Sequence, residues 1–127
     1  MLKAVTPALI VILVVVGVLV FYPHSPEEKR RKEEARLIKR LADPDREVRV
    51  VALSDLGERK VSSEFGSDEM VAALLGLLDD PDHVVRNSAA SFLGSIGPAA
   101  AEAKPGLVLL LKDEHFLVRG MAADSLI

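Results

Sequence analysis

The carboxyl-terminal three quarters of this chain contain one pattern three times, and this repetition restricts the possible folds more than any other feature. The middle copy, Leu78–Gly94, reads LDDPDHVVRNSAASFLG; it follows Leu41–Gly57 by 37 positions and precedes Leu111–Ile127 by 33. Self-similarity at periods of about 20–50 residues is typical of arrays in which each repeat buries its apolar face against its neighbours. We therefore expect a short array of similar units.

Each repeat is predicted to be two helices joined by an acidic turn. Apolar residues recur at i, i+1 and i+4 in the first helix and at every fourth residue in the second, so each set lies on one helix face. The columns are Leu37, Ile38, Leu41, Leu74, Leu75, Leu78, Leu107, Val108 and Leu111, then Val48, Ala52, Leu56, Val85, Ala89, Leu93, Val118, Ala122 and Leu126. Asp43 and Asp80, each followed by proline, are expected to cap the second helices. Gly57–Ser67 and Gly94–Lys104 are expected to be the loops between repeats.

Paired helices at this period, with an Asp six residues before an Arg in every copy, resemble HEAT repeats, and most closely the HEAT-like or PBS-lyase-type subtype. The resemblance covers residues 33–127, in copies at about 33–60, 67–96 and 98–127. It implies an all-α solenoid of about three helical hairpins. In this family the Asp and Arg columns commonly connect neighbouring repeats, so the resemblance assigns a structural ladder to Asp43, Arg49, Asp80, Arg86, Asp113 and Arg119.

The amino-terminal segment is predicted to be a transmembrane anchor in residues 1–22. Residues 4–22 carry no charge and would form a helix of about 28 Å, close to the thickness of a bilayer core. A cleaved signal peptide is the alternative, but residues 20–24 offer no small-x-small cleavage site. More Lys and Arg follow the span than precede it, so the positive-inside rule predicts a single-pass membrane protein with a cytoplasmic carboxyl-terminal domain.

Residues 23–32 are expected to be a charged juxtamembrane linker that leads into a solvated helix over residues 27–41. Glu27–Arg31 and Glu28–Lys32 have the spacing of helix-stabilising ion pairs. The basic cluster Lys29–Lys32 is interpreted as a topology signal and helix start. Binding of anionic lipid headgroups by this cluster is the other reading.

The chain shows few residues suited to catalysis. It has no Cys, its three histidines (His24, His83 and His115) lack metal-ligand spacing, and no Gly-rich phosphate loop is present. Residues 33–127 hold 11 basic and 17 acidic side chains, which disfavours nucleic acid as a partner. We expect no cofactor and no enzymatic activity. An enzyme or lyase-type accessory subunit of the HEAT-like family is the alternative.

The expected functional feature is therefore a binding surface. Its expected partner is a protein or peptide, whose identity the sequence does not give. In this family the second helices line the concave side, and the helical step of 100° turns one strip of them outward. That strip comprises Glu47, Val50, Ser54, Val84, Asn87, Ser91, Leu117, Gly120 and Asp124. Val50, Val84 and Leu117 are its expected apolar anchors, unless they only pack against adjacent helices.

The last repeat departs from the pattern. Ile127 stands in the column of Gly57 and Gly94, and no polar capping repeat follows. The apolar residues Leu107, Val108, Leu110, Leu117 and Leu126 are expected to include an exposed end face. This face predicts either self-association through the carboxyl-terminal repeat or a fragment of a longer array.

Overall fold

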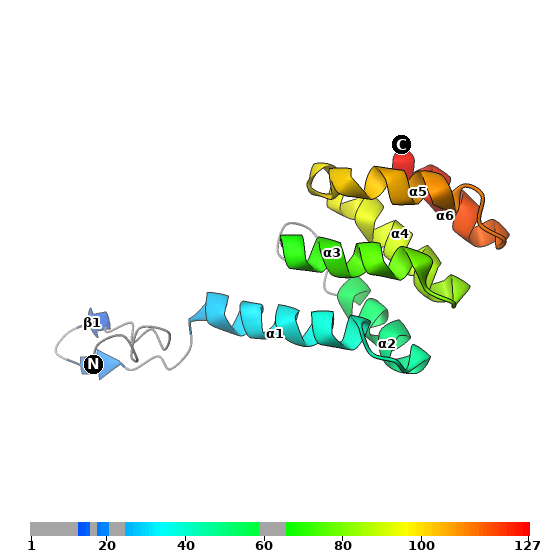
Figure 1. Cartoon of the computed structure of the whole chain (residues 1–127). Helices are drawn as coiled ribbons and strands as arrows, with labels where there is room; N and C mark the ends of the chain where they lie inside the picture. Colours follow the sequence, from blue (N-terminus) through cyan, green and yellow to red (C-terminus); the bar gives the residue numbers. More distant parts are fainter. Residues whose placement is uncertain (1–12, 16–17, 21–24, 59–65) are drawn as a thin grey trace. The chain divides into compact units, whose positions relative to one another are not determined.

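The computed structural model describes residues 13–15, 18–20, 25–58 and 66–127, and for residues 13–15, 18–20 and 98–100 it describes the backbone alone. These residues belong to two compact units, Met1–Ala35 and Arg36–Ile127. Figure 1 shows the chain, with β1 and the helices α1 to α6 labelled. The second unit covers most of the repeat domain that we expect over residues 33–127.

The described parts of the amino-terminal segment are two short strands. β1 (Leu13–Val15) pairs antiparallel with β2 (Val18–Val20), with Leu13 opposite Val20. Valine, isoleucine and their β-branched relatives favour extended backbone, which explains why this run pairs as strands. α1 (Pro26–Leu41) begins in the first unit and ends in the second. α1 confirms the helix predicted over residues 27–41, and its first turns include residues 26–32 of the predicted linker 23–32, of which residues 23–24 lie outside the described residues.

The prediction of a transmembrane helix over residues 4–22 is wrong where the structure describes the segment. Residues 13–15 and 18–20 are extended, and the rest of the predicted span lies outside the described residues. Across the described parts of the chain, every helix is too short or too polar to cross a bilayer. This finding contradicts the predicted single-pass membrane localisation. The predicted cytoplasmic orientation of the carboxyl-terminal domain depended on that span and therefore loses its support.

The second unit consists of three helical hairpins in its described residues. The first hairpin joins the end of α1 to α2 (Arg46–Glu58), and the second joins α3 (Asp68–Gly76), extended by the 3-10 turn η2 (Leu77–Asp79), to α4 (His83–Ile96). A 3-10 segment, η3 (Gly97–Ala103), leads into α5 (Lys104–Leu110), which pairs with α6 (Phe116–Leu126). α4 packs against α2 on one side and α6 on the other, as Figure 1 shows. The predicted all-α solenoid is confirmed for this unit.

The core follows the apolar columns of the sequence. Leu37 and Leu41 of the first hairpin are buried, and so are the following members of the same columns. They are Ala52, Leu56, Leu74, Leu78, Val85, Ala89, Leu93, Leu107, Val118 and Ala122. Alanine in the middle of each second helix lets its neighbour approach closely, as expected.

The capping residues differ from the prediction by two positions. Asp82, and not Asp80, accepts hydrogen bonds from the N–H groups of Val84 and Val85 at the start of α4, at 2.9 and 3.2 Å. Asp45 accepts in the same way from the N–H of Glu47 in α2. The earlier aspartate instead accepts from the N–H two residues on, within the turn, which leaves its second oxygen for an arginine.

Two glycines expected at the start of loops lie inside helices. Gly57 is in α2 and Gly94 is in α4, which continues to Ile96. A Cβ atom at Gly94 would lie 2.8 Å from the Cβ and Oγ atoms of Ser125 and 3.0 Å from its Cα. The glycine is therefore needed where α4 and α6 touch. Gly97, with φ of 70°, follows the last residue of α4.

Candidate functional site

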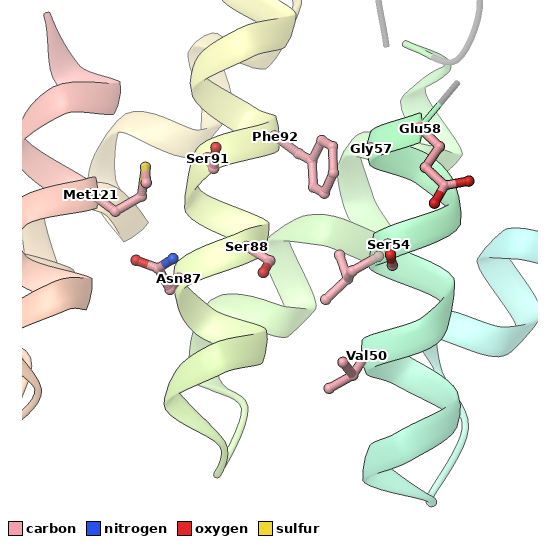
Figure 2. A pocket seen from close by; sticks show the side chains of 10 residues that line it. Val50, Ser54, Gly57, Glu58, Asn87, Ser88, Ser91, Phe92 and Met121 are labelled. Atoms are coloured by element: carbon pink, nitrogen blue, oxygen red, sulfur yellow. The ribbon is translucent and has the colours of Figure 1, made fainter. Parts of the chain in front are cut away.

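The second helices of the hairpins form a surface with a groove between α2 and α4. Its volume is about 470 Å³, and Met121 of α6 contributes at one side. Figure 2 shows the side chains that line it. They are Val50, Leu53, Ser54, Gly57, Glu58, Asn87, Ser88, Ser91, Phe92 and Met121.

Apolar side chains form the body of the groove. Leu53 is buried, while Val50, Phe92 and Met121 are half-buried and pack against the core. Phe92 projects from α4 toward Gly57 of α2, as Figure 2 shows, and a Cβ atom at Gly57 would lie 3.4 Å from its Cζ. This distance is an ordinary van der Waals contact, so the ring of Phe92 packs directly beside α2 at Gly57. The partly exposed faces of these side chains are available to an apolar group of a ligand.

Polar side chains surround this apolar body. Ser54 is exposed, and Asn87, Ser88 and Ser91 are half-buried. Within the part of the chain that the structure describes, none of these four side chains makes a hydrogen bond. Their donors and acceptors are thus free for the backbone of a bound segment. Glu58 is exposed at one end of the groove and adds a negative charge.

The groove contains four of the nine residues expected in the binding strip. Val50, Ser54, Asn87 and Ser91 line it. The other five lie on the surface outside its lining: Glu47, Val84, Leu117, Gly120 and Asp124 are all exposed. Of the expected anchors, Val84 is 36% exposed and Leu117 is 52% exposed, whereas Val50 packs partly against the core.

Sequence reasoning missed Phe92, the largest side chain of the groove. A signal for it was present, because Phe92 stands in the column of Asp55 and Ser125, where the other two repeats have polar residues. An aromatic residue in a polar column marks a departure from the repeat and therefore a local role. The prediction also missed five other lining residues, because it included only one position per helical turn of each second helix. These residues are Leu53, Gly57, Glu58, Ser88 and Met121.

The ladder residues connect neighbouring hairpins. Arg49 Nε lies 2.8 Å from Asp80 Oδ2, and its Nη2 donates to Oδ1 at 3.1 Å. Arg86 Nε and Nη2 donate to the two carboxylate oxygens of Asp113 at 2.8 and 2.9 Å. The Nη1 of each arginine donates to two carbonyls of its own turn, such as Asp80 O and Pro81 O for Arg86. Each guanidinium thus fixes its own turn and holds the next hairpin.

The electrostatics of the ladder agree with a structural role. The hydrogen bond from Arg86 is the largest influence on the pKa of Asp113 and lowers it, although burial opposes the change. A parallel pair on the surface, Arg46 with Asp82, lowers the pKa of Asp82 in the same way. Arg86 and Asp113 have side chains only 9% and 7% exposed, so neither is accessible to a ligand.

Arg119 and Asp43, two members of the predicted ladder, make hydrogen bonds within their own turns but no ion pair with another described residue. Arg119 Nη1 donates to the carbonyls of Asp113 and Glu114, as the other arginines do in their turns. Asp43 Oδ1 accepts from the N–H of Asp45, as Asp80 does from that of Asp82. No ion pair to either residue occurs in the described structure.

Two of the histidines lie together on the surface. The imidazoles of His83 and His115 stack with their centroids 3.8 Å apart, and Phe116 stacks on His115. His115 Nδ1 accepts a hydrogen bond from the N–H of Leu117 at the start of α6. Over residues 13–15, 18–20, 25–58 and 66–127, no three His, Cys, Asp or Glu residues gather in a group that could hold a metal ion. His24 lies outside the described residues.

Comparison with known proteins agrees with the repeat architecture. A family model described as HEAT repeats matches residues 34–127, which include the three hairpins, the groove and both rungs of the ladder. No curated protein matches the chain.

Proposed function

Because the chain belongs to the HEAT repeat family, we propose that it is a non-catalytic scaffold that binds a peptide segment of a partner protein in the groove between α2 and α4. Solenoids of this kind bind their partners on extended surfaces. The observation that carries the proposal is the composition of the groove. Half-buried Phe92, Met121 and Val50 lie beside polar side chains that make no hydrogen bonds to other described residues.

The chemistry of the groove favours a segment that is both apolar and basic. An apolar side chain of the partner would cover the exposed faces of Phe92 and Met121, and removal of such surface from water is the main driving force for association. The amide of Asn87 and the hydroxyls of the serines are suited to the polar groups of an adjacent peptide. Glu58, exposed at the end of the groove, would attract a lysine or arginine.

The basic residues of the repeats support a protein partner more than a nucleic acid. Arg49 and Arg86 are occupied by Asp80 and Asp113, and Arg40 and Arg46 pair with Asp55 and Asp82. These cations are neutralised within the protein. These four arginines, which repeat along the described hairpins, are therefore not available to neutralise phosphates.

A peptide selection on the full chain tests the proposal. Peptides would be selected from a displayed random library, and their affinity for the protein measured by fluorescence anisotropy. We expect binders that combine an apolar residue with a basic one. Their affinity should fall by about tenfold or more in Phe92→Ala and in Ser54→Arg, since the first removes the apolar wall and the second fills the groove with a like charge.

Ser95→Arg provides the matched control. Ser95 is exposed on α4, one turn beyond Ser91, and does not line the groove. It should leave the affinity unchanged. Selected peptides that bind the wild type, Phe92→Ala and Ser54→Arg equally well would place the binding site elsewhere and contradict the proposal.

A further inference from the structure

The two ends of the repeat domain present the two halves of one more ladder rung. Arg119 repeats the backbone contacts of Arg49 and Arg86, with Nη1 on the carbonyls of its own turn at 2.8 and 3.1 Å. Its exposed guanidinium therefore has the orientation that brings Nε and Nη2 onto a carboxylate in the two rungs already formed. Among the described residues no carboxylate pairs with Arg119, whereas in the internal rungs the carboxylate belongs to the neighbouring hairpin.

Asp43 has the matching geometry for an acceptor. In Asp80 and Asp113, which accept an arginine, Oδ1 also accepts from the N–H two residues on at 2.9 Å. Asp43 Oδ1 makes the same contact at the same distance. The nearby cations are already committed, since Arg40 pairs with Asp55 and Arg46 with Asp82. The turn therefore fixes the orientation of the Asp43 carboxylate, which can accept a guanidinium from outside the hairpin.

Apolar residues around the two half-rungs are exposed in the same way. Leu78 is buried against the next hairpin, where a Cβ atom at Gly106 would lie only 2.7 Å from its Cδ1. Leu111 occupies the same column in the third hairpin and is 40% exposed. At the opposite end, Val51 of α2 is 47% exposed, whereas Met121 in its column is half-buried. Each end therefore shows surface that the internal junctions cover.

We propose that the protein associates head to tail with a second copy of itself, with Arg119 of one molecule bound to Asp43 of the next. The third hairpin of one copy would then pack on the first hairpin of the other, in the arrangement that joins consecutive hairpins within the chain. The second copy is the occupant because this chain supplies both the guanidinium and the carboxylate in the required geometry. The two surfaces differ, so the contact is heterologous and extends into open-ended chains. This inference does not rest on the groove.

Sedimentation velocity of the full chain over a range of concentrations provides the test. The wild type should sediment faster as its concentration rises, and less so at high salt. Arg119→Gln and Asp43→Asn each remove one half of the contact, and Asp43→Asn keeps the oxygen that forms the turn. Each should weaken association by about thirtyfold or more, because the partner charge stays at the interface without a counter-ion.

Mixing the two variants separates a direct contact from an effect on folding. Arg119→Gln retains an intact Asp43 end, and Asp43→Asn retains an intact Arg119 end, so an equimolar mixture should form heterodimers that do not grow further.

Lys112→Gln removes a positive charge from the same end of the domain without touching the ladder, and should associate as the wild type does. If circular dichroism shows that Arg119→Gln is unfolded, Arg119→Lys replaces it. A lysine keeps the charge but lacks the planar guanidinium that contacts the turn and the carboxylate together, so association should still weaken.

Three outcomes would overturn the proposal. A wild type that stays monomeric at every concentration would leave this end of the domain to an occupant other than a second copy. Association that persists in both folded variants would place the contact elsewhere. A mixture of the variants that stays monomeric would show that Arg119 and Asp43 do not meet.

Discussion

At the scale of single residues, the arginine column shows how one side chain can hold two parts of a repeat. Arg86 donates to two carbonyls of its own turn and to both oxygens of Asp113 in the next hairpin. A buried ion pair contributes little net stability by itself, because its desolvation offsets the attraction. Loss of one partner is nevertheless costly, since the other charge stays buried.

This reasoning predicts a large difference between two arginines of the same column. Arg86→Ala should lower the free energy of unfolding by about 3–5 kcal/mol, because it leaves the Asp113 carboxylate buried and unpaired. Arg119→Ala should lower it by about 1 kcal/mol or less, because Arg119 is exposed and forms no rung within the described structure. Urea denaturation at low protein concentration measures both. Equal losses in the two variants would mean that the rung contributes no more than the turn contacts.

At the scale of secondary-structure elements, the distance between α4 and α6 depends on an absent side chain. Gly94 lies against the Cα, Cβ and Oγ atoms of Ser125, and Ser125 Oγ donates to Ala90 O at 2.8 Å. The two helices therefore touch through backbone and small side chains. A larger residue at position 94 would have to move a helix backbone, not just a flexible side chain.

Gly94→Ala should accordingly destabilise the protein, by about 1–3 kcal/mol, as expected for overpacking. Gly120 of α6 is the matched control, because a Cβ atom there meets no atom within 4 Å. Gly120→Ala should raise stability by up to about 1 kcal/mol, through the better helix propensity of alanine. Thermal denaturation of the two variants gives the comparison, and a stabilising Gly94→Ala would show that α4 and α6 can separate without cost.

At the scale of the whole molecule, the aspartates of the ladder and of the α4 cap make stability depend on pH. Hydrogen bonds from Arg86 and Arg46 lower the pKa of Asp113 and of Asp82 in the folded protein. A group whose pKa is lower in the folded state contributes stability above its unfolded pKa, which is about 3.9 for Asp, and loses it as the pH falls through the folded value.

The free energy of unfolding should therefore decrease once the pH drops below about 4, as these carboxylates become protonated in the unfolded chain first. Urea denaturation of the full chain between neutral pH and pH 2.5 measures the slope. Asp113→Asn removes one of the two groups, so its pH dependence should be shallower while its stability at neutral pH is lower. A slope identical to that of the wild type would show that Asp113 does not contribute to it.

The same scale shows what the sequence could and could not reveal. Columns such as Leu41, Leu78 and Ala89 repeat with the helical period, so the hairpins and their buried faces follow from the pattern. Phe92 was missed because a repeat argument describes what the copies share, and its ring lines the groove by departing from them. The prediction of a membrane helix was wrong because it depended only on the length and hydrophobicity of residues 4–22. Both properties are equally compatible with a segment that pairs with itself, as Leu13–Val15 does with Val18–Val20.

The orientation of the ladder has a consequence for how such a chain can change in length. The middle hairpin, α3 with α4, offers a carboxylate at Asp80 to the hairpin before it and a guanidinium at Arg86 to the hairpin after it. A duplicate of this segment inserted in frame would meet a suitable neighbour on both sides, and a deleted one would leave two matching ends to rejoin. Duplication or deletion of a whole hairpin would therefore keep an arginine opposite an aspartate at each junction of the ladder.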